Sequence, residues 1–211
     1  FLCAKKEQVE DTREVLENVS LRLAGVDSSA LAGVDALVGM GKISRKTRNF
    51  VVLFYEGPEA EICIYNDHFP VFSRYTKVPS SPDGTFNITR FIDDIRLTLE
   101  YYRREVGRAT LEKFYLVAME RDMAAFASVG DELGIPAEKL AVETIFEDQR
   151  LSSLYEYKAF ALAARGLAKQ GAGFNLVRDS GDASASDKDI LNYFKAQASG
   201  GPLNTNVIGG L

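Results

Sequence analysis

The sequence predicts an α/β domain with a mixed β-sheet flanked by helices. Residues 50–75 contain three strand-like runs separated by short turns, which indicates an antiparallel meander. From residue 88 to 169, helical and strand-like stretches alternate, as they do where helices connect the strands of a sheet. The predicted order is therefore β-β-β-α-β-α-β, followed by a closing helix. At 211 residues, 46% of them hydrophobic, the chain can bury a full core.

The first three strands differ in their apolar patterns. Phe50–Tyr55 is nearly all apolar, as a central strand covered on both faces would be. Ala60–Tyr65 alternates around Ile62 and Ile64, and Phe69–Tyr75 follows after a short turn.

The strongest helical pattern runs from residue 88 to 106, where apolar side chains recur every three or four residues. Gly107 follows as a stop signal. The other expected helices are at 7–24, within 27–40, at 123–133 and at 154–169, and the other expected strands are at 1–4, 113–119 and 140–146.

Composition excludes several classes of function. The net charge is -5 and the pI is about 5.1, so the chain lacks the positive surface that nucleic-acid binding requires. Cys3 and Cys63 form no CxxC motif, and His68 is the sole histidine, which leaves too few zinc ligands. We expect both cysteines to be buried free thiols and His68 to lie in a hairpin turn. No apolar run approaches the length of a membrane span.

Acidic side chains offer no clear catalytic pair. Asp93 and Asp94 are adjacent on the predicted long helix, so they diverge by about 100° and are expected to pair with Arg96 and Arg90 instead. A ribonuclease-H-type nuclease needs carboxylates on its first strand, and residues 50–55 contain none.

Several local segments resemble the actin-like proteins PilM and GspL, which belong to the assembly platforms of type IV pili and type II secretion. The order of elements also resembles the ribonuclease-H-like fold that actin-like ATPases share. The segments are AEICIYNDHFPVFSR at 60–74, TLEYYR at 98–103, KFYLVA at 113–118, ELGIP at 132–136 and YKAFALAARGLAKQGAGFNLV at 157–177.

This resemblance implies the second half of an actin-like fold over residues 1–179, N-terminally truncated, followed by a linker and a short helical or flexible tail at 180–211. It further implies a cytoplasmic scaffold, peripheral to the inner membrane, that binds an inner-membrane protein of the pilus or secretion platform. The resemblance leaves open whether the motor ATPase is a second partner and whether the protein forms a homodimer. Docking of a short segment in a cleft or on a sheet edge is the expected mode.

In that family, the first strand ends in an Asp-x-Gly turn, where the carboxylate orients the Mg²⁺ shell and backbone N–H groups contact phosphate. The resemblance aligns Phe54 with that Asp and Glu56 with that Gly. Tyr55 lies between them, and Gly57 is displaced by one residue. A phenylalanine ring cannot hold a hydrated Mg²⁺.

A second glycine turn contacts the nucleoside in the family, and here Met119, Glu120 and Arg121 replace it. Both changes predict a pseudo-ATPase without catalytic residues, metal or cofactor. The first alternative is an active ATP- and Mg²⁺-binding protein that uses Glu56 and Gly57 together with an upstream half-site. The second is an unrelated α+β protein-interaction domain.

Overall fold

A computed structural model describes residues 6–21, 23, 25–81, 84–107, 109–146 and 150–167. The chain divides into two units, one of residues 1–27 and 168–211 and the other of residues 28–167. The first unit contains helix α1, Lys6–Asn18. The strand expected at 1–4 and the tail expected at 180–211 lie outside the described residues. The predicted domain boundary at residue 179 stays a prediction.

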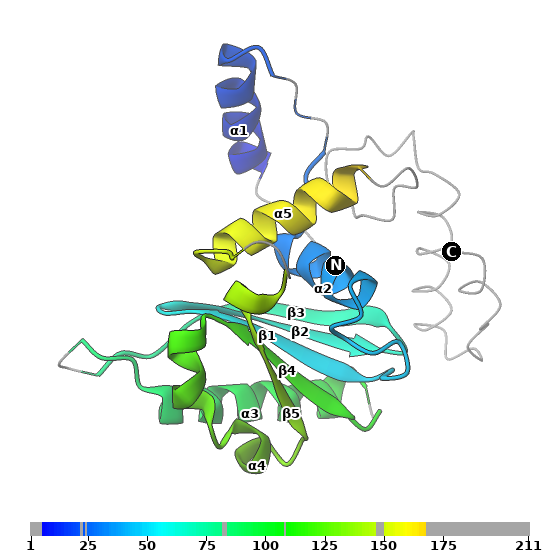
Figure 1. Cartoon of the computed structure of the whole chain (residues 1–211), viewed down its shortest axis with the longest axis vertical. Coiled ribbons are helices and arrows are strands. Elements are labelled where there is room, and N and C mark those ends of the chain that lie inside the picture. Colours follow the sequence, from blue (N-terminus) through cyan, green and yellow to red (C-terminus); the bar gives the residue numbers. More distant parts are fainter. Residues whose placement is uncertain are drawn as a thin grey trace. The chain divides into compact units, whose positions relative to one another are not determined.

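The second unit is built on a five-stranded mixed sheet in the order β3-β2-β1-β4-β5 (Figure 1). Strand β1 is central: it pairs antiparallel with β2 and parallel with β4, and its register with β4 begins at Phe50 opposite Lys113. The prediction of an antiparallel meander within a mixed sheet is confirmed. The strands are β1 Phe50–Glu56, β2 Glu59–Asn66, β3 Phe69–Lys77, β4 Lys113–Ala118 and β5 Ala137–Ala141.

Helices cover both faces of this sheet (Figure 1). Helices α2, Ser29–Gly39, and α5, Leu154–Leu167, pack together on one face. On the other face lie α3, Ile88–Glu105, and the short α4, Val129–Leu133. The 3₁₀ turns η1, Glu120–Phe126, and η2, Val142–Thr144, follow β4 and β5.

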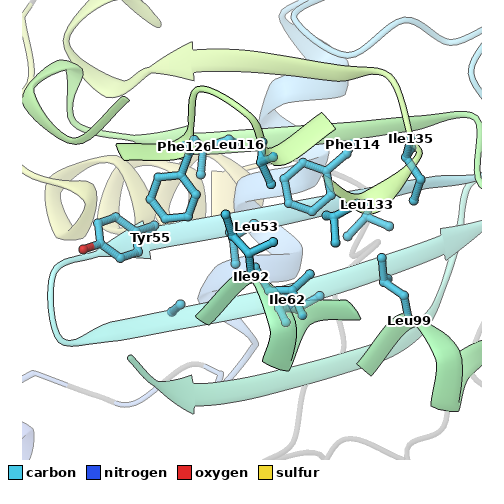
Figure 2. Close-up of a cluster of buried hydrophobic side chains, with 14 of the residues drawn as sticks. Leu53, Tyr55, Ile62, Ile92, Leu99, Phe114, Leu116, Phe126, Leu133 and Ile135 are labelled. Atoms are coloured by element: carbon cyan, nitrogen blue, oxygen red, sulfur yellow. The ribbon is translucent and has the colours of Figure 1, made fainter. Parts of the chain in front are cut away.

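The core beneath α3 and α4 follows from strand alternation. Leu53 and Tyr55 point toward α3, whereas Phe54 points to the α2 and α5 face, because successive side chains of a strand alternate. Figure 2 shows Leu53, Tyr55 and Ile62 of the sheet packed with side chains from α3, β4 and the β4–β5 connection.

Three predicted boundaries are wrong. The helix expected at 7–24 ends at Asn18, and Ser20 adopts a left-handed φ of 59° that no helix continues. The helix expected at 123–133 is divided into η1 and α4, because Ser128 has a non-helical ψ of 1°. The strand expected at 140–146 instead starts directly after Pro136, whose carbonyl accepts the Phe114 N–H, and residues 142–144 form a 3₁₀ turn.

Candidate functional site

A pocket of about 410 Å³ opens on the α5 side of the sheet, next to the carboxyl end of β1. The carboxyl ends of parallel strands are the usual location of ligand sites in α/β sheets. Side chains from β1, β2, β3, α2 and α5 line it: Ser29, Phe54, Glu56, Glu59, Ala60, Glu61, Tyr75, Leu154, Tyr155, Lys158, Ala159 and Leu162.

Phe54 forms the apolar floor of this pocket and is fully buried. Its ring packs against Gly33 of α2, where a Cβ would lie 3.0 Å from the Phe54 Cζ atom. The ring also stacks on Tyr157 of α5, with 6.4 Å between ring centroids. Tyr157 in turn donates a hydrogen bond to the Gly33 carbonyl. The position that the resemblance assigns to a metal-facing carboxylate is thus occupied by a packed ring.

Lys158 of α5 is the cation of the pocket wall. Its Nζ atom lies 5.3 Å from the centroid of the Phe54 ring and 3.0 Å from Glu61 Oε2. The Glu61 side chain is 18% exposed and also accepts a hydrogen bond from Ser73 at 3.4 Å. Because the ammonium group is only partly hydrated and already paired, its charge is largely balanced by that of Glu61.

Glu56, at the end of β1, carries a carboxylate that is poorly compensated. Its Oε2 atom is buried and has no hydrogen-bond partner among the described residues. Burial is the main cause that raises the pKa of Glu56 above its ordinary value, against the opposing effects of the Leu154 N–H and Lys158. Ionisation of Glu56 therefore destabilises the folded state.

We expect the Glu56→Gln substitution to raise the free energy of unfolding at pH 7 by about 1 kcal/mol, since an amide needs less solvation than a buried carboxylate and the side chain is partly screened by water. Because the folded-state pKa of Glu56 is raised, wild type loses stability as the pH climbs above 4.5. The thermal unfolding midpoints of the two proteins should therefore be similar at about pH 4 and should differ increasingly toward neutral pH. The neighbouring charged groups are the same in both proteins, namely Glu59, Glu61, Lys158 and Arg121. A difference in unfolding midpoint that is the same at all pH values would therefore contradict this prediction.

Glu59 joins two tyrosines at the mouth of the pocket. Tyr155 donates a hydrogen bond to Glu59 Oε2 at 3.1 Å. The interaction with the Tyr75 hydroxyl group is the first cause that lowers the pKa of Glu59, and the same interaction raises the pKa of Tyr75 to about 12. Tyr75 and Tyr155 are 56% and 60% exposed, so their rings remain available to a partner.

The remaining predicted residues at the end of β1 lie apart from the pocket. Tyr55 points to the opposite face of the sheet and packs edge-on against Phe126, with ring centroids 4.9 Å apart. Gly57 occupies the β1–β2 turn with a left-handed φ of 61°, a conformation that glycine adopts without strain. Of this group, only Phe54 and Glu56 line the pocket.

The three residues of the predicted second corner differ in burial, since Glu120 and Arg121 are exposed and Met119 is not. Met119 is buried, and the Glu120 N–H donates to both carboxylate oxygens of Glu143, at 3.1 and 3.0 Å. Arg121 is exposed and lies 3.9 Å from Asp122. None of residues 119–121 lines the pocket.

The sequence prediction missed Glu59, Glu61, Tyr75, Tyr155 and Lys158 as pocket residues. A signal for the two glutamates was present: residues two apart in a strand share a face, and both are charged within an otherwise apolar run. The contribution of α5 depends on how this helix crosses the sheet, which local sequence does not reveal.

Cys63, His68 and Asp93 behave as predicted, whereas Cys3 lies outside the described residues. Cys63 is fully buried, and burial raises the pKa of its thiol to about 12. His68 lies in the β2–β3 turn with φ of 64°. Asp93 forms an ion pair with Arg96. Within the described ranges, no three His, Cys, Asp or Glu side chains are grouped to hold a metal ion, and no helix there has the length and apolarity of a membrane span.

Comparisons with known proteins find likeness in structure alone. No family model matches the sequence, and no curated protein matches it. A chain of a PilM–PilN type IV pilus biogenesis complex matches at a TM-score of 0.59 with 19% identity, over 77% of this chain and 59% of that chain.

Two further structures are more distant. The ethanolamine utilization protein EutJ from Carboxydothermus hydrogenoformans matches at a TM-score of 0.44 with 14% identity, over 64% of this chain and 57% of EutJ. A ROK family transcriptional regulator, a homologue of the E. coli MLC protein, matches at 0.35 with 13% identity, over 53% of this chain and 36% of the regulator. The protein thus spans somewhat more than half of the PilM–PilN chain, and it has the α/β fold of the actin-like proteins.

Proposed function

We propose that the protein is a non-catalytic scaffold of a type IV pilus assembly platform. In this function it lies on the cytoplasmic side of the inner membrane and holds a PilN-like inner-membrane protein. The observation that carries the proposal is the shared fold with a chain of a PilM–PilN complex, at a TM-score of 0.59. The sequence segments between residues 60 and 177 that resemble PilM and GspL, in the same order along the chain, also support it. A type II secretion platform is the corresponding alternative.

The pocket chemistry supports a scaffold that does not use ATP. Three carboxylates, those of Glu56, Glu59 and Glu61, line the pocket together with a single lysine. Because Lys158 already pairs with Glu61, a nucleotide phosphate would meet mainly like charge. The buried Phe54 ring occupies the strand position where the family has its metal-facing carboxylate.

Saturating Mg·ATP is therefore expected to leave the thermal unfolding midpoint unchanged. A genuine site occupied at 100 times its Kd would stabilise the fold by about 2.7 kcal/mol, which corresponds to a shift of several degrees. The titration should use the longest natural form of the chain, with circular dichroism to establish that it is folded. A clear shift would favour the alternative in which Glu56 and Gly57 hold phosphate.

Partner binding tests the scaffold directly. Isothermal titration with the cytoplasmic segment of the PilN-like protein from the same organism should give saturable binding, whereas a scrambled segment of equal composition should not bind. The sheet offers β3, a nine-residue strand at one sheet edge, as a surface for strand addition. Absence of binding to PilN-like and type II secretion segments alike would contradict the scaffold function.

A further inference from the structure

The pocket lining contains three carboxylates and one ammonium group. Lys158 compensates Glu61 at 3.0 Å, and this leaves Glu56 and Glu59 as carboxylates without a paired ammonium or guanidinium group in the pocket lining. The buried Oε2 atom of Glu56 adds to this field, because it lacks a hydrogen bond among the described side chains. Carboxylates near a partly desolvated cavity attract a cation and disfavour an anion.

The mouth of the pocket adds two aromatic surfaces to this charge. Tyr155 of α5 donates a hydrogen bond to Glu59 Oε2 at 3.1 Å, and the hydroxyl group of Tyr75 on β3 lies near enough to the same carboxylate for Glu59 to raise the pKa of Tyr75. More than half of each tyrosine side chain is exposed, at 56% and 60%. Large exposed rings beside a carboxylate are the arrangement in which a guanidinium group stacks on a ring and donates to the acid.

The apolar part of the pocket lining suits the aliphatic part of a long cationic side chain. Leu154, Ala159 and Leu162 of α5 line the pocket together with the Phe54 ring. Arginine buries its methylene stem along such surfaces and keeps its charged end among polar groups. A volume of about 410 Å³ accommodates one such side chain with adjoining backbone.

We propose that this pocket binds an arginine side chain of a partner protein, with the guanidinium group between Tyr75 and Tyr155 and against Glu59. Arginine is favoured over lysine because its planar group can both stack and donate two hydrogen bonds. A partner segment is favoured over a nucleotide because the carboxylates oppose phosphate. The inference rests on the proposed scaffold function only for the partner's identity, since the pocket's chemistry can be measured without that partner.

The first experiment titrates the protein with N-acetyl-arginine amide and records ¹H–¹⁵N chemical shifts. Shifts are expected around Glu59 and Tyr155, with a Kd on the order of millimolar for so small a probe. The neutral isostere N-acetyl-citrulline amide should bind at least about tenfold more weakly, since it lacks the charge. Equal shifts with both compounds, or shifts with Mg·ATP in their place, would overturn the proposal.

Matched variants assign the binding to this pocket. Tyr155→Ala and Glu59→Gln should each weaken arginine binding at least about fivefold, through loss of the ring or of the charge. Tyr101→Ala and Glu100→Gln change the same residue types at exposed positions on α3 and should leave binding unchanged. If Tyr155→Ala does not fold, Glu59→Gln alone decides. Unchanged binding in Glu59→Gln would overturn the proposal.

The two proposals fail in distinguishable ways. If the PilN-like segment binds wild type and Tyr155→Ala equally, the scaffold function stands and the arginine pocket is wrong. If the blocked arginine binds in the pocket but no pilus or secretion segment binds the protein, the pocket stands and the scaffold function is wrong.

Discussion

Phe54→Ala is expected to lower the free energy of unfolding by about 3–5 kcal/mol, the usual cost of truncating a fully buried phenylalanine. The ring is 0% exposed and joins three elements, because it packs on Gly33 of α2 and on Tyr157 of α5 from its place in β1. Its loss also removes the surface over which the Lys158 ammonium lies. Urea unfolding followed by circular dichroism measures the change.

Phe86→Ala provides the matched control, because the same truncation is made at a side chain that is 39% exposed. This variant should lose about 1 kcal/mol or less. A loss at Phe54 no larger than the loss at Phe86 would mean that α2 and α5 do not pack on β1 in solution as they do in the structure. The floor of the pocket would then need a different explanation.

Gly33→Ala is the second large effect, with an expected loss of about 1–3 kcal/mol from overpacking. A Cβ at residue 33 would lie 3.0 Å from the Phe54 ring and 3.3 Å from the Tyr157 ring. Both rings are fully buried, so neither can move aside without displacing its neighbours. The helix preference for alanine, up to about 1 kcal/mol, opposes but does not cancel this clash.

Gly39→Ala isolates that helix preference in the same helix. Residue 39 is the last residue of α2, and nothing lies within 4 Å of the Cβ it would gain. The substitution should leave stability unchanged or raise it slightly. If Gly33→Ala and Gly39→Ala shift the thermal midpoint in the same direction, the close approach of α2 to Phe54 is contradicted.

The sheet was predictable because its signals are local. The apolar run of β1 indicated a strand covered on both faces, and the alternation around Ile62 and Ile64 indicated the strand β2, although residues 62–65 are buried on both of its faces. The short turns between strands then required antiparallel pairing. These features depend on residues close in sequence, which is why the meander and the long helix α3 followed from the sequence.

The pocket was only half predictable, since it depends on contacts between distant segments. Phe54 and Glu56 were identified through their place in a resembling motif, whereas Lys158 reaches Glu61 from 97 positions along the chain. No periodic pattern in the sequence indicates that these two residues come into contact. The same holds for β5, whose start is set by pairing with β4 and not by its own apolar pattern.

The parallel pairing of β1 with β4 has a consequence for the rate of folding. Phe50 lies opposite Lys113, so the pair closes a loop of about sixty residues, whereas the β1–β2 and β2–β3 hairpins close only short turns. Pairings between distant segments form slowly, because chain entropy is lost before contacts compensate for it. We therefore expect the meander of β1, β2 and β3 to form early in folding. The docking of β4 is expected to be the slow step that completes the sheet.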